Sequence, residues 1–470
     1  MTVLATSDRP PVTDSTALAA AVLFMFKRFT FASGELEMPC DLAYLDQHMQ
    51  LIEDVLQAFY QRPPLEELQT WRQIVAAKIT EGQASDVPTR LLLKYEAYDP
   101  FVGLTGGFQL SITLKEHTEI DFVNKKIDHH SAVQFEQLTT AKGEILMPCV
   151  PSLIEQHIRQ LERVLRSLRQ ELSDVELNTW RQAIAPNVAT WFDDSPNSYL
   201  VVQYELVDPS LGLQSGIKLN VFPKIKSIED HYQHWADTRE GPLFGSHPDA
   251  KVMAIATQLG MPADTPILDV GAGTGRNTLA LARQGYPVDA LELTYVLIEQ
   301  LYTTARTEGL AIRLIQADIL NPQLVLKSTY YRLVFLSEVI ASHFRNPAQV
   351  RQLMMLMSEA IAPGGFLLFN LFLTVDDYEP NDIVRELSQF CWSYVMTRQE
   401  LQDCLADLPL EIISDESVFD YERLHLPPEA FPPTAWFTNW ATGRNLFPIQ
   451  EAPPAELRWI VCRRLEADGR

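Results

Sequence analysis

The stretch that decides the fold runs from Pro266 to Glu292 and reads PILDVGAGTGRNTLALARQGYPVDALE. Its first residues, 267–270, have the short apolar pattern of a buried strand, and three glycines follow at once. Leu279 and Leu281 then begin a helical run, and a second apolar strand ends on Glu292. This order of strand, glycine turn, helix and strand predicts a βαβ unit that binds a nucleoside.

Each part of this unit has a physical role. Glycines at the end of a strand let the backbone turn tightly and let a ligand approach it closely, which a Cβ atom would prevent. The following helix directs its free N–H groups toward that ligand. A carboxylate at the end of the second strand can accept hydrogen bonds from the two ribose hydroxyls. We therefore expect Glu292 to hold the sugar.

The spacing of the glycines distinguishes two classes of cofactor. Dinucleotide binders use Gly-x-Gly-x-x-Gly, whereas this chain has Gly271-x-Gly273-x-Gly275, preceded by Asp269. The spacing therefore disfavours a nicotinamide-dependent oxidoreductase. Together with the strand and Glu292, it resembles motif I of the class I methyltransferases that depend on S-adenosyl-L-methionine (SAM).

The resemblance implies positions for the rest of the cofactor site. Asp318, after a predicted strand at 313–316, matches the acid that accepts from the adenine amino group. The segment 228–236 resembles the one before motif I in small-molecule methyltransferases, where an aromatic residue lies over the methionine part of SAM. Tyr232 is the candidate, and a surface aromatic on a linker helix is an equally good interpretation. The full set of cofactor-binding candidates is Tyr232, Asp269, Gly271, Ala272, Gly273, Gly275, Asn277, Glu292, Leu293, Asp318, Ile319 and Ser337.

The remaining pattern predicts how the fold continues. Further strands are expected at 333–336, 366–372, 410–420 and 457–464, and the Ala362-Pro363-Gly364-Gly365 turn is typical of the approach to strand 5 in this family. We thus expect an α/β, Rossmann-like seven-stranded methyltransferase domain over residues 225–470. Such folds place the ligand at the carboxyl ends of the strands.

The end of the fourth strand bears on the acceptor. Enzymes that methylate amino groups of DNA bases or glutamine commonly carry Asn/Asp-Pro-Pro-Tyr there, whereas this chain has Ser337-Glu338-Val339-Ile340. The formal net charge of −23 also argues against a nucleic-acid partner. We therefore expect a small-molecule acceptor. Glu338 and His343 are the candidate catalytic bases, because histidine titrates near neutral pH, although a lone histidine after a strand is more often structural.

Two inserts are candidates for the acceptor pocket. One, 374–381, is acidic, and the other, 421–454, is rich in proline and aromatic residues. A long loop in a compact domain usually has a task. The second insert is expected to be a lid or pocket wall, or to cover a sheet edge. The first reading predicts that Trp440→Ala raises the acceptor KM and leaves SAM affinity unchanged.

The first half of the chain contains an internal duplication. The sequence GELEMPC at 34–40 recurs as GEILMPC at 143–149, an offset of 109 residues. The same offset relates the TWRQ motifs at 70–73 and 179–182 and the pair Tyr95 and Tyr204. The sequence thus predicts two α+β tandem repeats, 1–118 and 119–224. That the two copies pack about a pseudo-two-fold axis is a hypothesis.

Each repeat is expected to be a helical pair followed by a β-hairpin, with an Asp-Pro turn at 99–100 or 208–209. The Met-Pro-Cys sequences are read as preceding a helix, and Trp71 and Trp180 as core anchors. Cysteines and histidines recur between the copies, but their spacing is not zinc-like, so no metal is predicted. Those residues are Cys40, Cys149, His48 and His157.

Composition bounds the remaining questions. An apolar content of 46% over 470 residues suffices for two or three domains. Five cysteines without Cys-x-x-Cys suit a reduced, cytoplasmic protein. The apolar run 17–26 is too short to span a bilayer and is read as a buried helix, so no membrane association is expected. The repeats could recruit substrate or form a homodimer. A protein methyltransferase that docks its target through the repeats, and a non-catalytic SAM-binding regulator, stay open.

Overall fold

The computed structural model describes residues 15–60, 62–97, 108–116, 139–207, 216–225, 227–239 and 241–466. The chain divides into two compact units: residues 22–225 form one, and residues 226–470 form the other together with the start of the chain up to Ala21. The first border falls inside helix α1 (Ser15–Arg28), where Val22, Met25 and Phe26 are buried. The apolar run at this place is thus helical, as predicted.

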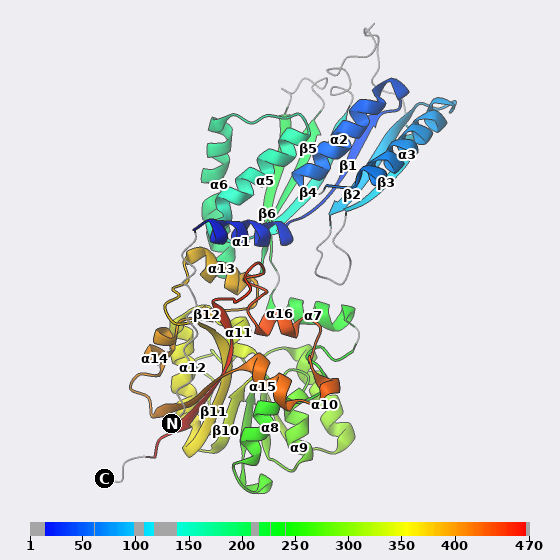
Figure 1. Ribbon diagram of the computed structural model, residues 1–470. Coiled ribbons are helices and arrows are strands. Elements are labelled where there is room, and N and C mark those ends of the chain that lie inside the picture. Colours follow the sequence, from blue (N-terminus) through cyan, green and yellow to red (C-terminus); the bar gives the residue numbers. More distant parts are fainter. Residues whose placement is uncertain are drawn as a thin grey trace. The chain divides into compact units, whose positions relative to one another are not determined.

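In the N-terminal unit, two segments have the same order of elements (Figure 1). The first consists of β1 (Phe31–Pro39), α2 (Leu45–Ala58), α3 (Leu65–Gln83), β2 (Thr89–Ala97) and β3 (Phe108–Glu116). The second consists of β4 (Thr140–Pro148), α5 (Ile154–Ser167), α6 (Asp174–Asp194), β5 (Tyr199–Val207) and β6 (Gly216–Lys224). Their described strands form one antiparallel sheet in the order β3-β2-β1-β4-β5-β6.

The two segments meet through their equivalent strands. β1 pairs antiparallel with β4, and Gly34 lies opposite Gly143, its counterpart at the 109-residue offset. Ala32 pairs with Ile145 and Leu36 with Ala141, so the register reads the same from either strand. The centre of the sheet is therefore self-complementary, as in a two-fold symmetric dimer interface.

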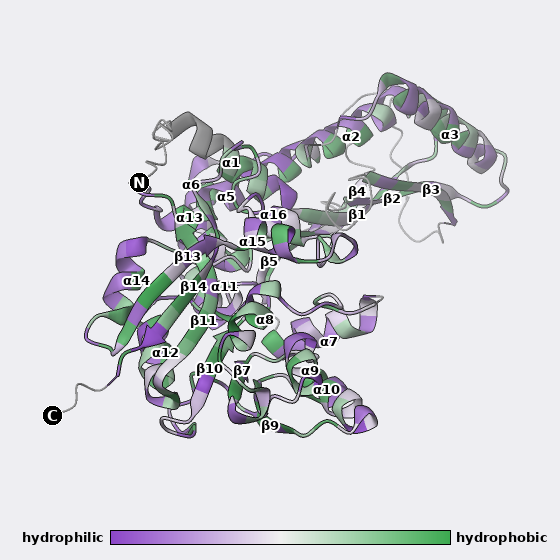
Figure 2. Cartoon of the chain, turned by 60° about the horizontal axis from the view of Figure 1, so that its bottom comes forward, coloured by the Kyte–Doolittle hydropathy of each residue, from purple (hydrophilic) through white to green (hydrophobic). Residues whose placement is uncertain are grey.

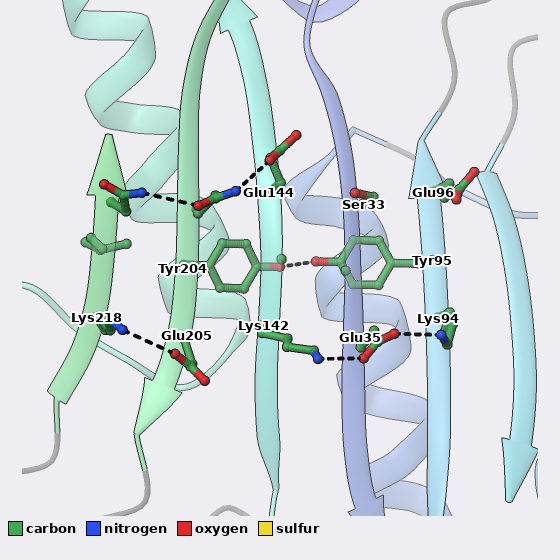
Figure 3. Close-up of a pocket in the computed structure, with 15 residues that line it drawn as sticks. Ser33, Glu35, Lys94, Tyr95, Glu96, Lys142, Glu144, Tyr204, Glu205 and Lys218 are labelled. Atoms are coloured by element: carbon green, nitrogen blue, oxygen red, sulfur yellow. Dashed lines mark hydrogen bonds and ion pairs between the residues drawn. The ribbon is translucent and has the colours of Figure 1, made fainter. Parts of the chain in front are cut away.

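Two buried tyrosines cross this centre. Tyr95 on β2 lies beside Gly34, Tyr204 on β5 lies beside Gly143, and the two hydroxyls are hydrogen-bonded to each other. Figure 3 shows the phenol rings pointing toward one another. A Cβ atom on either glycine would lie 2.5 Å from the adjacent hydroxyl oxygen. Glycine is needed at both places because the rings occupy the space of a side chain.

Two sequence-based predictions for this unit need correction. Residues 34–39 and 143–148 belong to strands β1 and β4, so each segment has one strand more than predicted, although a helix does follow Met-Pro-Cys within a few residues in both copies, as expected. The cause is an alternation of buried and exposed residues too short to recognise beside glycine and proline. Trp71 and Trp180 are only partly buried. The predicted Asp-Pro turns and the boundary at 118 lie outside the described residues.

The repeated histidines tie each first strand to the next helix. His48 Nε2 lies 2.8 Å from the Pro39 carbonyl oxygen, and His157 Nε2 lies 2.7 Å from that of Pro148. Cys40 and Cys149 Sγ donate to the carbonyl oxygens of Ile79 and Val188. No group of three or more metal-ligating side chains occurs among the described residues. These side chains serve packing between strand and helix.

The C-terminal unit is built on a mostly parallel sheet in the order β13-β14-β11-β10-β7-β8-β9, with a short β12 paired to β11. The strands are β7 (Ile267–Val270), β8 (Val288–Glu292), β9 (Ile312–Gln316), β10 (Tyr331–Leu336), β11 (Ile361–Thr374), β12 (Val395–Met396), β13 (Leu410–Ser417) and β14 (Ala455–Arg464). β14 runs antiparallel to both neighbours. Figure 2 shows β10 and β11 to be mostly hydrophobic, as expected for strands buried on both faces.

Helices cover both faces of this sheet (Figure 1). They are α7 (Ile228–Thr238), α8 (Ala250–Thr257), α9 (Arg276–Arg283), α10 (Tyr295–Glu308), α11 (Val339–His343), α12 (Pro347–Ala360), α13 (Asp382–Phe390), α14 (Arg398–Leu405), α15 (Val418–His425) and α16 (Phe437–Ala441). The predicted strand 410–420 ends early because α15 begins at Val418, where Ser417 caps it. None of the described helices is long and apolar enough to cross a membrane.

The insert between β13 and β14 contains α15 and α16. Trp440 is buried against Phe372 of β11, and its Nε1–H donates to the Trp392 carbonyl oxygen at 2.9 Å. The expectation that Trp440 forms a pocket wall is therefore replaced by a packing role, in which it fixes the backbone of Trp392.

Candidate functional site

The glycine loop follows β7 and joins it to α9. Gly271, Gly273 and Gly275 have φ values of 75°, 55° and 93°, which lie in the region where glycine is favoured. The Gly271 and Ala272 N–H groups donate to the Leu291 carbonyl oxygen at 2.8 and 3.0 Å. The turn is thus fastened to the end of β8, which brings the two parts of the predicted nucleoside site together.

Glu292 ends β8 beside this loop. Its two carboxylate oxygens accept the N–H groups of Gly273 and Thr294, each at 2.8 Å. The side chain is buried, and burial raises the pKa of its carboxyl, although these backbone hydrogen bonds lower it. The loop and the following turn hold the Glu292 carboxylate in a fixed place, where it could also accept from ribose hydroxyls.

The other predicted cofactor residues lie around this loop. Buried Asp269 accepts from the Thr278 hydroxyl, and burial raises the pKa of its carboxyl to about 7. Asp318 is exposed after β9, and its carboxylate accepts the N–H of Leu320 at 2.8 Å. Leu293 and Ile319 are partly buried beside their respective acids.

Tyr232 and His343 come together although 111 residues separate them. The Tyr232 hydroxyl lies 2.9 Å from His343 Nε2, and His343 Nδ1 has no hydrogen-bond partner among the described residues. Burial lowers the pKa of His343 to about 4. Burial also raises the pKa of Tyr232, as do the charges of Glu292 and Glu338. Both side chains are therefore neutral at pH 7.

An aromatic cluster surrounds this pair. We define it as His231, Tyr232, Trp235, His343 and Trp392, whose rings lie 5.3–6.5 Å apart. Trp392 has a φ of 56°, a strained value for a non-glycine residue. Phe244 links Tyr232 to the loop, because its ring would lie 3.2 Å from a Cβ atom on Gly273. The cluster thus borders the glycine loop.

A buried charge network joins three elements at the same edge of the sheet. Arg276, the first residue of α9, contacts both Asp249 carboxylate oxygens, at 2.9 and 3.0 Å. The Ser337 hydroxyl donates to Asp249 at 2.7 Å, and Asn277 Nδ2 donates to it at 2.9 Å. The Arg276 guanidinium also reaches Glu338 at 3.4 Å. Ser337 and Asn277 therefore contact Asp249 directly.

Several of these residues were not found from the sequence. Arg276 follows the third glycine and could have been noticed there, whereas its partner Asp249 lies 27 residues earlier with no motif around it. Trp392 and Phe244 gave no signal, because isolated aromatic residues are common in apolar cores. These side chains meet only through the tertiary fold.

The residues at this edge fit a SAM molecule. The positive-φ glycines leave the loop backbone uncovered by side chains of its own, and acids stand at the ends of β8 and β9. The buried carboxyls of Asp249, Asp269 and Glu292 outnumber the one guanidinium of Arg276 among them. This excess of acid suits a cofactor with a positive sulfonium group.

Comparisons with known proteins concern the part of the chain that contains the glycine loop. Residues 267–365 match a family model described as a methyltransferase domain. An uncharacterized methyltransferase of Bacillus subtilis, YodH, is 31% identical over 126 residues, or 26% of this chain and 51% of that protein. The chain thus spans about half the length of this curated relative.

Solved structures are also similar. Geranyl diphosphate C-methyltransferase from Streptomyces coelicolor, in complex with S-adenosyl-L-homocysteine, matches with a TM-score of 0.37 and 15% identity, over 46% of this chain and 79% of that one. The [4+2]-cyclase SpnF matches with a TM-score of 0.35 and 16% identity, over 47% and 81%. The family match and the relative thus identify a methyltransferase domain at residues 267–365, in agreement with the predicted class I SAM-dependent fold and with SAM as its cofactor.

Proposed function

We propose that this protein transfers a methyl group from SAM to a small-molecule acceptor. One observation carries the proposal: the Tyr232–His343 pair lies beside a glycine loop that is fastened to Glu292. Groups suited to holding a nucleoside and groups suited to accepting a proton thus meet at the carboxyl ends of parallel strands, where α/β folds bind ligands.

The cofactor supplies a methyl group already activated on sulfur, so the residues must mainly orient the reactants and exclude water. In the proposed arrangement, Glu292 accepts from the ribose hydroxyls, Asp318 from the adenine amino group, and the glycine loop lies against the rest of the cofactor. Tyr232 covers the methionine part. Asp269 and Asn277 support the loop and the start of α9.

His343 is the proposed proton acceptor. If Nε2–H donates to the Tyr232 hydroxyl, Nδ1 keeps its lone pair for a proton from the acceptor. The lowered pKa keeps the imidazole neutral at pH 7, as a base must be. Tyr232 then acts through His343 by fixing the orientation of its ring.

The N-terminal unit is proposed to recruit substrate or to form a homodimer, with repeats at 1–118 and 119–224 and the catalytic domain at 225–470. One face of its sheet carries a hollow of about 720 Å³ (Figure 3). Paired charges line it, including Lys94–Glu35 at 2.7 Å and Lys142–Glu35 at 3.1 Å. We further propose that the protein is cytoplasmic, and that it binds no nucleic acid, given its net charge of −23.

Calorimetric titration of the full chain with SAM, S-adenosylhomocysteine and NADH tests the proposal. We expect micromolar binding of the two sulfur nucleosides and none of NADH. Glu292→Ala should weaken SAM binding about 100-fold, because charge-assisted hydrogen bonds to the ribose are lost. Glu144→Ala, which removes a carboxylate in the other unit, is the matched control.

Transfer of labelled methyl groups to a panel of small molecules tests activity. We expect His343→Gln to lower kcat at least tenfold with SAM affinity unchanged. Binding of NADH in place of SAM would contradict the cofactor assignment. SAM binding without transfer to any acceptor would favour the non-catalytic regulator instead.

A further inference from the structure

Glu338 has a strained backbone at the end of β10. Its φ is 66°, a value that non-glycine residues rarely adopt, and its N–H donates to Asn370 Oδ1 at 2.7 Å. Such a strained conformation persists only where the surrounding structure enforces it, often at functional sites. The backbone is thus held in a conformation that fixes where the Glu338 side chain begins.

Arg276 contacts the Glu338 carboxylate but does not donate a hydrogen bond to both of its oxygens. The guanidinium is 8% exposed and makes its two shortest contacts with Asp249, and it reaches only Glu338 Oε1, at 3.4 Å. Glu338 Oε2 accepts no hydrogen bond among the described residues, and the side chain is 18% exposed. One carboxylate oxygen at the edge of the site therefore remains available to a ligand.

The charge of this network is unbalanced. One guanidinium faces two carboxylates, so Arg276, Asp249 and Glu338 together carry one negative charge when both acids are ionised. The aromatic cluster lies close by, because α11 begins directly after Glu338 and ends at His343, and the Glu338 charge acts on Tyr232. Aromatic faces and a carboxylate both attract cations.

We propose that Glu338, positioned by Arg276, selects an acceptor that carries an amine. The inference rests on the proposed function and narrows its substrate class. The acceptor ammonium would bind Glu338 Oε2 beside the aromatic cluster. Hydroxyl acceptors of the same shape would leave the carboxylate without a charged partner, and carboxylate acceptors would be repelled.

The proposed reaction balances in protons and charge. The ammonium bound by Glu338 gives one proton to His343 Nδ1, the proton acceptor of the proposed function, and becomes a neutral amine. The nitrogen lone pair forms the new N–C bond to the methyl carbon, while the C–S bond breaks and its electron pair stays on sulfur. The positive charge thus moves from sulfur to the methylated nitrogen, and the proton on His343 passes to solvent after product release.

Binding of matched ligands tests the selection without turnover. Phenethylamine, 2-phenylethanol and 3-phenylpropanoate are titrated calorimetrically into the full chain saturated with S-adenosylhomocysteine. We expect the amine to bind at least tenfold more tightly than the other two. Glu338→Gln should remove that preference and change SAM affinity less than twofold. Glu308→Gln, at an exposed carboxylate in the same unit, is the control.

Two further variants test the positioning role of Arg276. Arg276→Met should weaken amine binding about as much as Glu338→Gln, whereas Arg276→Lys should restore part of it. Burial raises the pKa of Glu338 to about 7 against the opposing charge of Arg276. Amine binding should therefore strengthen from about pH 6 to 8 in the wild type only. Asp249, His343 and Tyr232 also face this place, and Glu338→Gln separates their titration from that of Glu338.

The outcomes separate this inference from the proposed function. Equal binding of amine and alcohol, or a loss of SAM affinity in Glu338→Gln as large as the loss for the amine, would overturn the selection and assign Glu338 to the cofactor. A wild type that binds SAM but shows no amine preference overturns only the inference. A wild type that binds no SAM overturns the function on which it rests.

Discussion

The two units treat buried polar groups in opposite ways. In the N-terminal unit, the repeated histidines contact backbone carbonyl oxygens, and Tyr95 and Tyr204 are hydrogen-bonded to each other. The buried polar side chains there are uncharged, and their hydrogen bonds stabilise the packing of the unit. In the C-terminal unit, ionisable carboxyls gather at one edge of a parallel sheet around Arg276. In the first unit, equivalent residues of the two repeats stabilise the fold. In the second unit, side chains that are not related by a repeat gather to form a site.

This contrast has a physical basis. A self-complementary sheet places equivalent residues against each other at its centre, so a charge there meets a like charge. Parallel strands bring all their carboxyl ends, and the turns that follow, to one edge. The second arrangement can therefore combine different side chains around one ligand.

The largest expected effect that tests the comparison between the two units is a loss of stability on substitution of the central glycines. A Cβ atom on Gly143 would lie 2.6 Å from the Ser33 carbonyl oxygen, which belongs to the backbone, whereas the three atoms nearest to one on Gly34 all belong to the Tyr95 side chain. Gly143→Ala should lower the free energy of unfolding of the N-terminal unit by about 3 kcal/mol, and Gly34→Ala by about half as much.

Hydrogen exchange of the full chain, read by peptides from each unit, measures this effect. SAM affinity should stay unchanged in both variants. An equal loss in the free energy of unfolding for the two variants would mean that the tyrosine side chains move aside equally well at either glycine. Loss of protection in both units at once would mean that they unfold together, against the separation described here.

Acid should act on the units in opposite directions. Burial lowers the pKa of His157 to about 4, so its folded state stays neutral while the unfolded chain takes up a proton below about pH 6.5. The N-terminal unit therefore loses stability as the pH falls toward 4.

Burial instead raises the pKa values of Asp269, Glu338 and Glu422 to about 7. Their stabilising contribution is complete below about pH 4, where carboxyls of the unfolded chain are protonated, and is lost as the pH rises through 7. The lowered pKa of His343 has the opposite effect on the pH dependence of stability, but it is one group against three carboxyls. Urea unfolding at pH 5 and 7, followed by exchange in each unit, should show the C-terminal unit more stable at pH 5. A shift of both units in the same direction would break the comparison.

The smallest expected effect concerns Trp440. Trp440→Phe keeps the packing on Phe372 but leaves the partly buried Trp392 carbonyl oxygen without its N–H donor, at a cost of about 1 kcal/mol. We expect a rise of a few-fold in acceptor KM, because Trp392 belongs to the aromatic cluster, and no change in SAM affinity. Reduced SAM affinity would place Trp392 against the cofactor instead.

The sequence predicted the C-terminal site best where the site residues belong to one short motif, because the local backbone geometry of that motif explains each of them. Gly271, Gly273, Gly275 and Glu292 lie within 22 residues, and each is required by the backbone geometry of one turn. Contacts such as Tyr232 with His343 depend on how distant elements pack, so the two residues were found separately and their hydrogen bond was not. In the N-terminal unit, the repeat offset indicated equivalent strands, but the strand at 31–39 was missed because glycine and proline obscure its alternation.

The Tyr95–Tyr204 hydrogen bond has an evolutionary consequence. Only one proton can lie between two hydroxyl oxygens, so one tyrosine donates and its counterpart accepts, even where the backbones around them are equivalent. In an assembly of two identical chains, every mutation would appear on both sides of that axis. Because one gene encodes both repeats here, each repeat can accumulate mutations without the other. Natural selection can therefore change the two halves of the sheet independently.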